Sequence, residues 1–129
     1  MILCAGEALI DMIPNDTGAY APHVGGAVLN TAVALGRLGV PTGLVTGLSF
    51  DPFGARITAH LRDSHVDTRH AVPSDRNTTL AFVHLKDGQA TYSFYDDNTA
   101  TSAILPRDLP EVPDGTEALF FGGISLCNP

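Results

Sequence analysis

Positive charge and long apolar runs are both scarce in this chain, and each shortage excludes a class of function. Seven Lys and Arg residues stand against fourteen Asp and Glu residues among 129, which gives a formal net charge of −7. This sign argues against a nucleic acid or an anionic membrane surface as a partner. No apolar run is long enough to span a membrane, and the first residues lack the basic stretch of a signal peptide. We therefore expect a cytoplasmic protein that binds neither nucleic acid nor membrane.

Cysteine occurs only twice, which argues against a disulfide framework or a zinc site. Cys4 and Cys127 both lie in apolar stretches, so the sequence predicts two buried, reduced thiols within strands. Apolar residues, in contrast, are plentiful: 44% of the chain is hydrophobic and only 16% is charged. Such a chain can bury a sizeable core, and its length suits one domain at most.

Apolar runs alternate with helical patterns along most of the chain. Near-continuous apolar runs are typical of strands buried on both faces of a parallel sheet. The alternation of strands and helices implies right-handed crossovers between such strands. The sequence predicts strands at 2–13, 43–48 and 118–126 and helices at 27–38 and 51–64, the second opened by an aspartate cap and a proline.

A hairpin interrupts this alternation. Asp87 and Gly88 lie between two runs of β-branched and aromatic residues, which is a strong signal for two antiparallel strands. A hairpin does not belong in a parallel sheet, so we expect a separate small sheet that also includes a segment near the start of the chain. The strands of this sheet are predicted within 13–24 and 78–95.

Two glycines, Gly25 and Gly26, open the first predicted helix, and Asn30 follows one turn later among small apolar residues. A helix start offers unpaired N–H groups and the positive end of the helix dipole, and glycines let a ligand approach the backbone. The pattern therefore indicates a ligand site. A tight loop that leads into a buried helix explains the glycines equally well, but it does not explain the amide side chain of Asn30.

Four segments, in order, carry a resemblance to a known family: GEALID at 6–11, the stretch from the paired glycines at 25–39, GLSFDPFG at 47–54, and the hairpin region at 79–100. Together they resemble the ribokinase-like (PfkB) carbohydrate kinases, and above all the bacterial fructokinases in that family. These kinases transfer the γ-phosphoryl group of ATP to a hydroxyl of a sugar or nucleoside. The resemblance covers the whole chain, and it implies a sugar substrate with ATP and Mg²⁺ as cofactors.

The resemblance also implies a fold: α/β, with a parallel Rossmann-like sheet, helices on its faces and a small antiparallel β lid. The family's Gly-rich anion hole, its catalytic aspartate and most of its nucleotide site belong to a later part of the sequence, and no stretch here resembles them. Residues 1–129 are thus expected to be the N-terminal part of a single ribokinase-like domain, with no catalytic residue and no activity alone. A homodimer through the lid strands is implied for the full-length protein.

The family's sugar-binding residues carry over to the positions that match its motifs. Asp11, at the end of a strand, would accept hydrogen bonds from sugar hydroxyls, and its alternative role is to cap the strand or the next turn. The resemblance assigns substrate contacts to Asp11, Gly25, Gly26 and Asn30, and it places Phe82, Phe94 and Tyr95 in the lid over the substrate. The three aromatic residues would equally serve as cross-strand pairs that stabilise the hairpin. Glu7 is left without an assigned role.

Asp96 marks a departure from one branch of the family. In relatives that act on keto-deoxy sugar acids, an arginine near this position binds the substrate carboxylate, whereas Asp96 would repel it. The sequence therefore favours a neutral sugar, above all fructose. Two alternatives stay open: a nucleoside kinase of the same family, with Tyr20, Phe82 and Tyr95 as the slot for a base, and a non-catalytic sugar-binding or assembly module.

Overall fold

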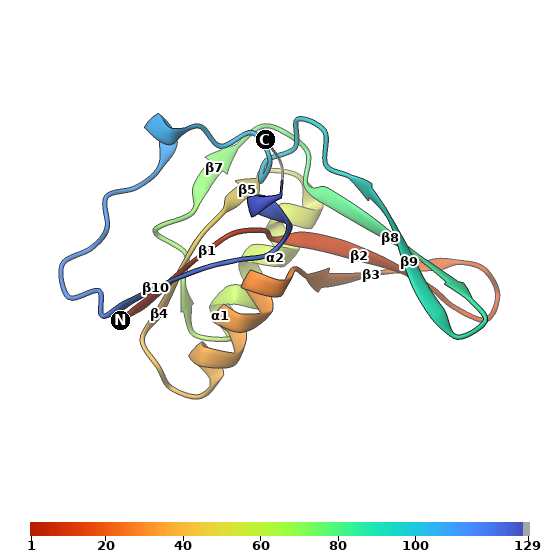
Figure 1. The fold of residues 1–129 in the computed structure, drawn as a ribbon, viewed down its shortest axis with the longest axis horizontal. Coiled ribbons are helices and arrows are strands. Elements are labelled where there is room, and N and C mark those ends of the chain that lie inside the picture. Colours follow the sequence, from red (N-terminus) through yellow and green to blue (C-terminus); the bar gives the residue numbers. More distant parts are fainter. Residues whose placement is uncertain (128–129) are drawn as a thin grey trace.

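The computed structural model describes residues 1–127 and arranges them mainly in two separate four-stranded sheets and two helices (Figure 1). The first sheet is entirely parallel, as the alternation of strands and helices predicts. Its strands lie in the order β10 (Ala118–Phe121), β1 (Ile2–Ala5), β4 (Thr42–Val45) and β6 (Val66–Asp67). The α/β fold class predicted from the sequence is confirmed.

Helices α1 (Ala27–Arg37) and α2 (Pro52–Asp63) lie in the connections between the strands of this sheet. The connections from β1 to β4 and from β4 to β6 step across the sheet in the same direction, so right-handed crossovers put both helices on one face. The core lies between helices and sheet, where Leu29, Leu44 and Leu61 are fully buried. Burial of each such side chain stabilises the fold by about 1.5–3 kcal/mol.

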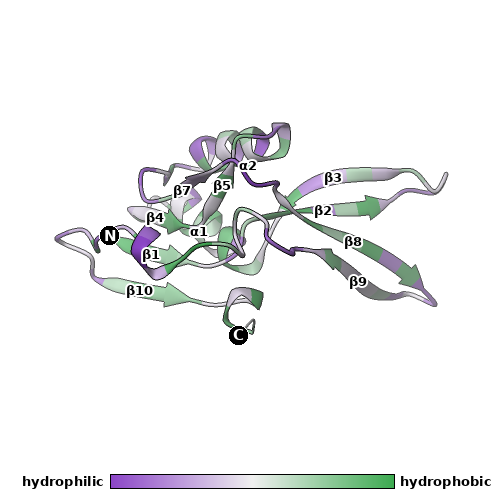
Figure 2. Ribbon diagram, turned by 90° about the horizontal axis from the view of Figure 1, so that it is seen from above, coloured by the Kyte–Doolittle hydropathy of each residue, from purple (hydrophilic) through white to green (hydrophobic). Residues whose placement is uncertain are grey.

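The second sheet projects from this body and is called the arm below (Figure 2). Its strands lie in the order β3 (Tyr20–Gly25), β2 (Leu9–Pro14), β8 (Thr79–Lys86) and β9 (Gln89–Tyr95). The predicted hairpin around Asp87 is confirmed as the antiparallel pair β8–β9. Strands β2 and β3 form a second antiparallel hairpin, and the two hairpins join through a parallel pairing of β2 with β8. The arm is therefore antiparallel within its hairpins and parallel at its centre.

Two apolar runs that we predict as single strands are each divided between sheets. The run at 2–13 forms β1 in the parallel sheet and then β2 in the arm. The run at 43–48 forms β4 and then β5 (Gly47–Ser49), which pairs with β7 (Val72–Ser74) in a two-stranded sheet. Gly6 and Glu7 stand at the first break and Thr46 at the second, but one or two such residues do not mark a change of sheet within runs that are otherwise apolar.

The last predicted strand, at 118–126, ends earlier than expected. Strand β10 stops at Phe121, and Gly123 then turns the chain with a positive φ of 74° into the one-turn helix η2 (Ile124–Leu126). Every residue of β10 is exposed, because within residues 1–127 this edge strand pairs only with β1. Another short turn of helix, η1 (Pro106–Asp108), lies in the preceding proline-rich segment.

The two cysteines differ in their surroundings. Cys4 on β1 is buried with a free thiol, as predicted, and its burial raises the pKa of that thiol. Cys127 is exposed and follows η2, so the prediction that it is buried in a strand is wrong. None of the helices in the described part of the chain is both long and apolar enough to cross a membrane.

Asp51 caps the start of α2 and ties it to the arm. Its Oδ1 accepts hydrogen bonds from the backbone N–H of Gly54 (2.7 Å) and the hydroxyl of Thr78 (2.7 Å), and its Oδ2 accepts one from the backbone N–H of Thr78 (2.7 Å). Pro52 follows at the first helical position, as the sequence predicts. Burial alone raises the pKa of Asp51, but the hydrogen bonds from Thr78 and Gly54 outweigh it and hold this pKa below its usual value.

Asp51→Ala is expected to lower the free energy of unfolding by about 2 kcal/mol at neutral pH, because the helix cap and the link to β8 are both lost. The pKa of Asp51 is lower in the folded state, so its contribution is complete above the unfolded pKa and is lost as the pH falls through the folded pKa. Urea unfolding at neutral pH and at about pH 3 measures both effects. Asp63→Ala, at the exposed end of the same helix, is the matched control. An equal loss of unfolding free energy at both pH values would show that the charge of Asp51 does not contribute to stability.

Candidate substrate-binding site

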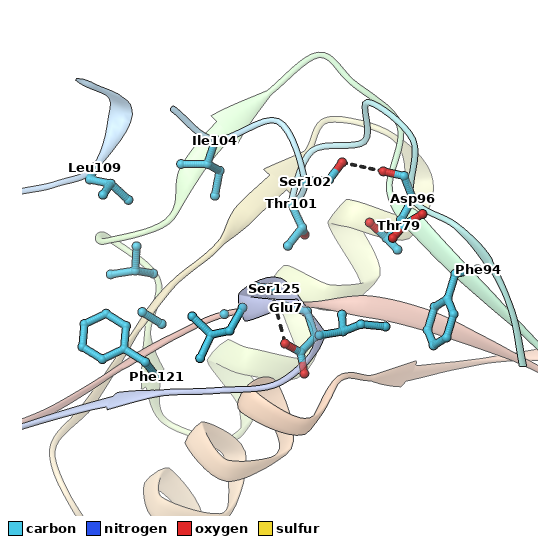
Figure 3. Close-up of a pocket in the computed structure, with 15 residues that line it drawn as sticks. Glu7, Thr79, Phe94, Asp96, Thr101, Ser102, Ile104, Leu109, Phe121 and Ser125 are labelled. Atoms are coloured by element: carbon cyan, nitrogen blue, oxygen red, sulfur yellow. Dashed lines mark hydrogen bonds between the residues drawn. The ribbon is translucent and has the colours of Figure 1, made fainter. Parts of the chain in front are cut away.

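Two adjoining cavities lie between the arm, the start of α1 and the turn after β10. The α1 cavity, of about 390 Å³, is lined by Glu7, Leu9, Asp11, Gly26, Ala27, Asn30, Tyr92, Phe94, Gly123 and Ile124. The β10 cavity, of about 430 Å³, shares Glu7, Phe94 and Ile124 with it (Figure 3). The two cavities therefore form one cleft. It lies at the carboxyl ends of β1 and β10, where open α/β sheets bind their ligands.

Asp11 lies half-buried on β2 and lines the α1 cavity. Its carboxylate lies against Gly25 on the paired strand β3, where a Cβ would collide with Oδ2, so Gly25 makes room for Asp11 and does not itself line the cavity. Burial raises the pKa of Asp11, and the charge of His23 opposes this increase. A carboxylate in this position can accept hydrogen bonds from a ligand that enters the cavity.

Gly26 and Asn30 line the same cavity from the first turn of α1. Gly26 has a φ of 115°, a conformation that favours glycine, and a Cβ there would lie 2.7 Å from the carbonyl oxygen of Glu7. The backbone N–H of Asn30 donates to the carbonyl of Gly26 (2.8 Å), and the exposed amide side chain can both donate and accept hydrogen bonds. The structure thus brings Asp11, Gly26 and Asn30 to one cavity.

The three aromatic residues predicted for the lid are divided between the two faces of the arm. Phe94 pairs with Ala81, which pairs with Asp11, so these residues share the face that meets the cleft, and Phe94 lines both cavities. Phe82 and Tyr95 each lie one position further along their strands, and adjacent strand residues point to opposite faces. The structure therefore does not bring Phe82 and Tyr95 over the cleft, contrary to the prediction.

Phe82 and Tyr95 instead join Tyr20 in an aromatic cluster on the far face of the arm. The ring centroid of Phe82 lies 5.1 Å from that of Tyr20 and 5.3 Å from that of Tyr95, both with edge-to-face geometry. Such pairs contribute about 0.5–1.5 kcal/mol each beyond their burial. On the near face, Tyr92 stacks beside Phe94 with ring centroids 6.0 Å apart and lines the α1 cavity, a contact that the sequence analysis missed.

Glu7 is the site residue that sequence reasoning left unassigned. Its side chain is buried at the junction of the two cavities, in a residue only 4% exposed. Its Oε1 accepts hydrogen bonds from the backbone N–H groups of Ala27 (2.9 Å) and Val28 (3.4 Å) at the start of α1. The N-cap residue Gly26 has no side chain, so Glu7 caps the helix from a distant part of the sequence. The sequence signal of this role is weak: Glu7 is one of two acids within the apolar run at 2–13.

Acidic side chains dominate the charge of the cleft. Glu7 and Asp11 line the α1 cavity, Glu7 and Asp96 line the β10 cavity, and within residues 1–127 no Lys, Arg or His lines either one. Such a wall suits a neutral, hydroxyl-rich ligand, because carboxylates accept hydrogen bonds from hydroxyls and repel anions. It does not fit the triphosphate of a nucleotide, which cations or free helix N-termini bind. The described residues also hold no group of three His, Cys, Asp or Glu side chains placed to bind a metal ion.

Comparison with known proteins connects this chain with sugar kinases. A family model described as pfkB family carbohydrate kinase matches residues 1–119. The chain is 52% identical over 130 residues to a fructokinase of Rhizobium leguminosarum bv. trifolii, across 98% of this chain and 40% of that protein. The chain therefore spans about two fifths of the length of this relative.

The fold of this chain matches those of solved sugar kinase structures. A sugar kinase from Pyrococcus horikoshii, PH1459, matches with a TM-score of 0.88 at 32% identity, over 98% of this chain and 46% of that one. A fructokinase from Vibrio cholerae O395, in a form with fructose, ADP and calcium ion bound, matches with a TM-score of 0.77 at 28% identity, over 93% of this chain and 39% of that one. The arm and the parallel sheet are thus parts of a fold that sugar kinases use.

Proposed function

The chain belongs to the pfkB family of carbohydrate kinases, and we propose that it provides the sugar-binding part of an ATP-dependent fructokinase. In this reaction the γ-phosphoryl group of ATP is transferred to a hydroxyl group of the sugar. The observation that supports the proposal best is the meeting of Asp11, Gly26 and Asn30 in one acidic cavity. The 52% identity to one fructokinase and the fructose-bound form of another favour fructose as the acceptor.

Asp11, Asn30 and Gly26 each contribute to sugar binding in a different way. The Asp11 carboxylate accepts hydrogen bonds from sugar hydroxyls, the Asn30 amide donates and accepts them, and Gly26 lets a hydroxyl approach the backbone. Together they orient the acceptor, which lowers the entropic part of the reaction barrier. Phe94 on the arm helps to exclude water, which competes with the sugar as phosphoryl acceptor.

The rest of the catalytic machinery is proposed to lie outside residues 1–129. Phosphoryl transfer needs a base for the acceptor hydroxyl and positive charge at the phosphates, and the acidic cleft offers no cation within residues 1–127. Leu119, Phe120 and Phe121 are each at least 40% exposed on the edge strand β10, which suits a further segment of a single domain packed there. ATP and Mg²⁺ would bind mainly to that further segment, so the 129-residue chain alone would be inactive.

The charge of the cleft also narrows the choice of acceptor. Asp96 lines the β10 cavity, where a substrate carboxylate would meet a like charge. We therefore favour a neutral ketohexose over a keto-deoxy sugar acid. The nucleoside alternative lacks support, because Tyr20, Phe82 and Tyr95, the residues considered for a base-binding slot, lie on the far face of the arm. The alternative of a non-catalytic module requires that the full-length protein bind fructose without turnover.

A homodimer through the arm is part of the proposal. Tyr20, Phe82 and Tyr95 cluster on the face of the arm away from the cleft, and Tyr95 is 62% exposed. A second copy of the arm offers the same aromatic surface, which suits a symmetric interface. We also propose a cytoplasmic location, because the free thiols of Cys4 and Cys127 suit a reducing compartment.

Tyr95→Asp is expected to convert the dimer to a monomer, because it places a charge within the proposed apolar interface. Sedimentation velocity on the full-length protein measures the mass. Tyr92→Asp, a change of the same kind on the cleft face of the same strand, is the matched control and should leave the dimer intact. A wild-type monomer, or a dimer that survives Tyr95→Asp, would rule out this interface.

Asp11→Ala and Asn30→Ala are expected to raise the KM for fructose in the full-length protein, while the KM for ATP stays within about twofold. For Asp11, loss of a hydrogen bond to a charged group costs about 1.5–3 kcal/mol, or roughly tenfold and more in KM. Steady-state kinetics with each substrate varied in turn test this expectation. Asp16→Ala, in an exposed turn, is the control. Unchanged fructose kinetics in a folded Asp11→Ala protein would remove Asp11 from the site.

Asp96→Arg is expected to reduce the preference for fructose over 2-keto-3-deoxygluconate by about tenfold or more. At an effective dielectric constant of about 20, two charges about 4 Å apart interact by about 4 kcal/mol, and water in the open cleft reduces this figure. Competition between the two acceptors measures the preference. Asp97→Arg makes the same change one residue further on, outside both cavities, and should have no effect. If the wild type prefers the sugar acid, Asp96 does not select the acceptor.

A further inference from the structure

Glu7 contacts two segments that lie far apart in the sequence. Besides capping α1, its carboxylate accepts through Oε2 a hydrogen bond from the hydroxyl of Ser125 in η2 (3.4 Å), the contact drawn as a dashed line in Figure 3. Within residues 1–127 this carboxylate forms no ion pair. Burial of an unpaired carboxylate is costly unless hydrogen bonds compensate for it. Here the N–H groups and the positive dipole end of α1 provide the main compensation.

Two glycines lie against Glu7, one before α1 and one before η2. A Cβ at Gly26, before α1, would lie 2.7 Å from the carbonyl oxygen of Glu7, and a Cβ at Gly123, before η2, would collide with the carboxylate itself. Both glycines also have positive φ values, 115° and 74°. Gly26 thus lies against the backbone of Glu7 and Gly123 against its carboxylate, which leaves Glu7 little freedom to move.

The position of Glu7 links it to the sugar-binding residues. It lines the α1 cavity together with Asp11 and Asn30, and it lines the β10 cavity together with Ser125. Asn30 lies one turn into the helix that Glu7 caps, and its backbone N–H bonds to Gly26. A displaced helix start would therefore move Gly26 and Asn30 relative to Asp11.

We propose that Glu7 is a positioning residue for the acceptor sugar: its carboxylate fixes the start of α1 against the turn after β10 and so sets where Gly26 and Asn30 meet the substrate. This inference rests on the proposed function, because it concerns the same cavity. It assigns Glu7 no proton transfer. The carboxylate also occupies the helix start that would otherwise attract an anion, which keeps the cavity suited to neutral hydroxyl groups.

Kinetics of Glu7 variants in the full-length protein test the proposal. Glu7→Ala removes both helix contacts and is expected to raise the KM for fructose about tenfold, whereas Glu7→Gln keeps an acceptor oxygen for Ala27 and is expected to raise it about threefold. The kcat and the KM for ATP should stay within about twofold of wild type. Glu111→Ala, at an exposed position, is the matched control. Ile57→Val in the core is the control for stability, since it lowers the melting temperature away from the cleft.

If Glu7 only stabilises the fold, its variants should affect the KM for fructose no more than other destabilising variants do. If Glu7→Ala raises the KM for fructose no more than Ile57→Val does at a similar loss of melting temperature, the proposal is overturned. If Glu7→Ala does not fold, Glu7→Asp takes its place, because its shorter side chain draws the carboxylate away from Ala27. A wild-type KM for fructose in Glu7→Asp overturns the proposal as well.

A second measurement is independent of kinase activity. Formate can occupy the space that Glu7→Ala leaves at the start of α1, so it is expected to raise the melting temperature of this variant and not that of the wild type or of Glu111→Ala. For Glu7→Asp, the expected result is a lower melting temperature than that of Glu7→Gln. If the wild type phosphorylates no sugar, the proposed function fails, and these melting temperatures still decide whether Glu7 anchors the helix. No response to formate in a folded Glu7→Ala protein counts against the anchor.

Discussion

The hydrogen bonds between the carboxylate of Glu7 and the first N–H groups of α1 hold the parallel sheet, the arm and the helix in one arrangement. Glu7 lies where the chain leaves β1 and enters β2, so a contact at this point orients three elements at once. Asp11 follows on β2, and Asn30 follows within the first turns of α1. The shape of the α1 cavity depends on how the start of this helix meets β2. The hydrogen bonds of Glu7 therefore matter to the proposed sugar contacts of Asp11 and Asn30.

Negative charge is concentrated in the same region, and it has a cost in stability. Burial raises the pKa of Asp11, which means that the folded protein holds this carboxylate in its charged form less readily than the unfolded chain does. No basic side chain within residues 1–127 lines the cleft to offset the charge. Sugar hydroxyls can satisfy the free carboxylate oxygens without bringing a charge of their own. The acidic wall is thus consistent with a neutral polyol as the natural occupant.

The parts of the fold with local signals could be predicted from the sequence. The hairpin follows from Asp87 and its neighbouring glycine, and the start of α2 follows from Asp51 as a cap. The breaks within the apolar runs could not be predicted, since a few residues such as Glu7 or Thr46 do not show that the pairing partners change. The candidate site was also only partly predictable. The paired glycines indicate the cavity. The face of the arm on which Phe82 or Tyr95 lies depends on strand register, which a single sequence does not specify. The contact of Glu7 with α1 joins residues twenty positions apart and has no local pattern.

The central claim is that the α1 cavity binds the acceptor sugar. A crystal structure of the full-length protein with fructose bound tests this claim most directly. The account predicts fructose in the α1 cavity, with hydroxyl oxygens within about 3.2 Å of the Asp11 carboxylate and of the Asn30 amide. Fructose bound elsewhere, or bound in the cleft without contact to Asp11, would contradict it.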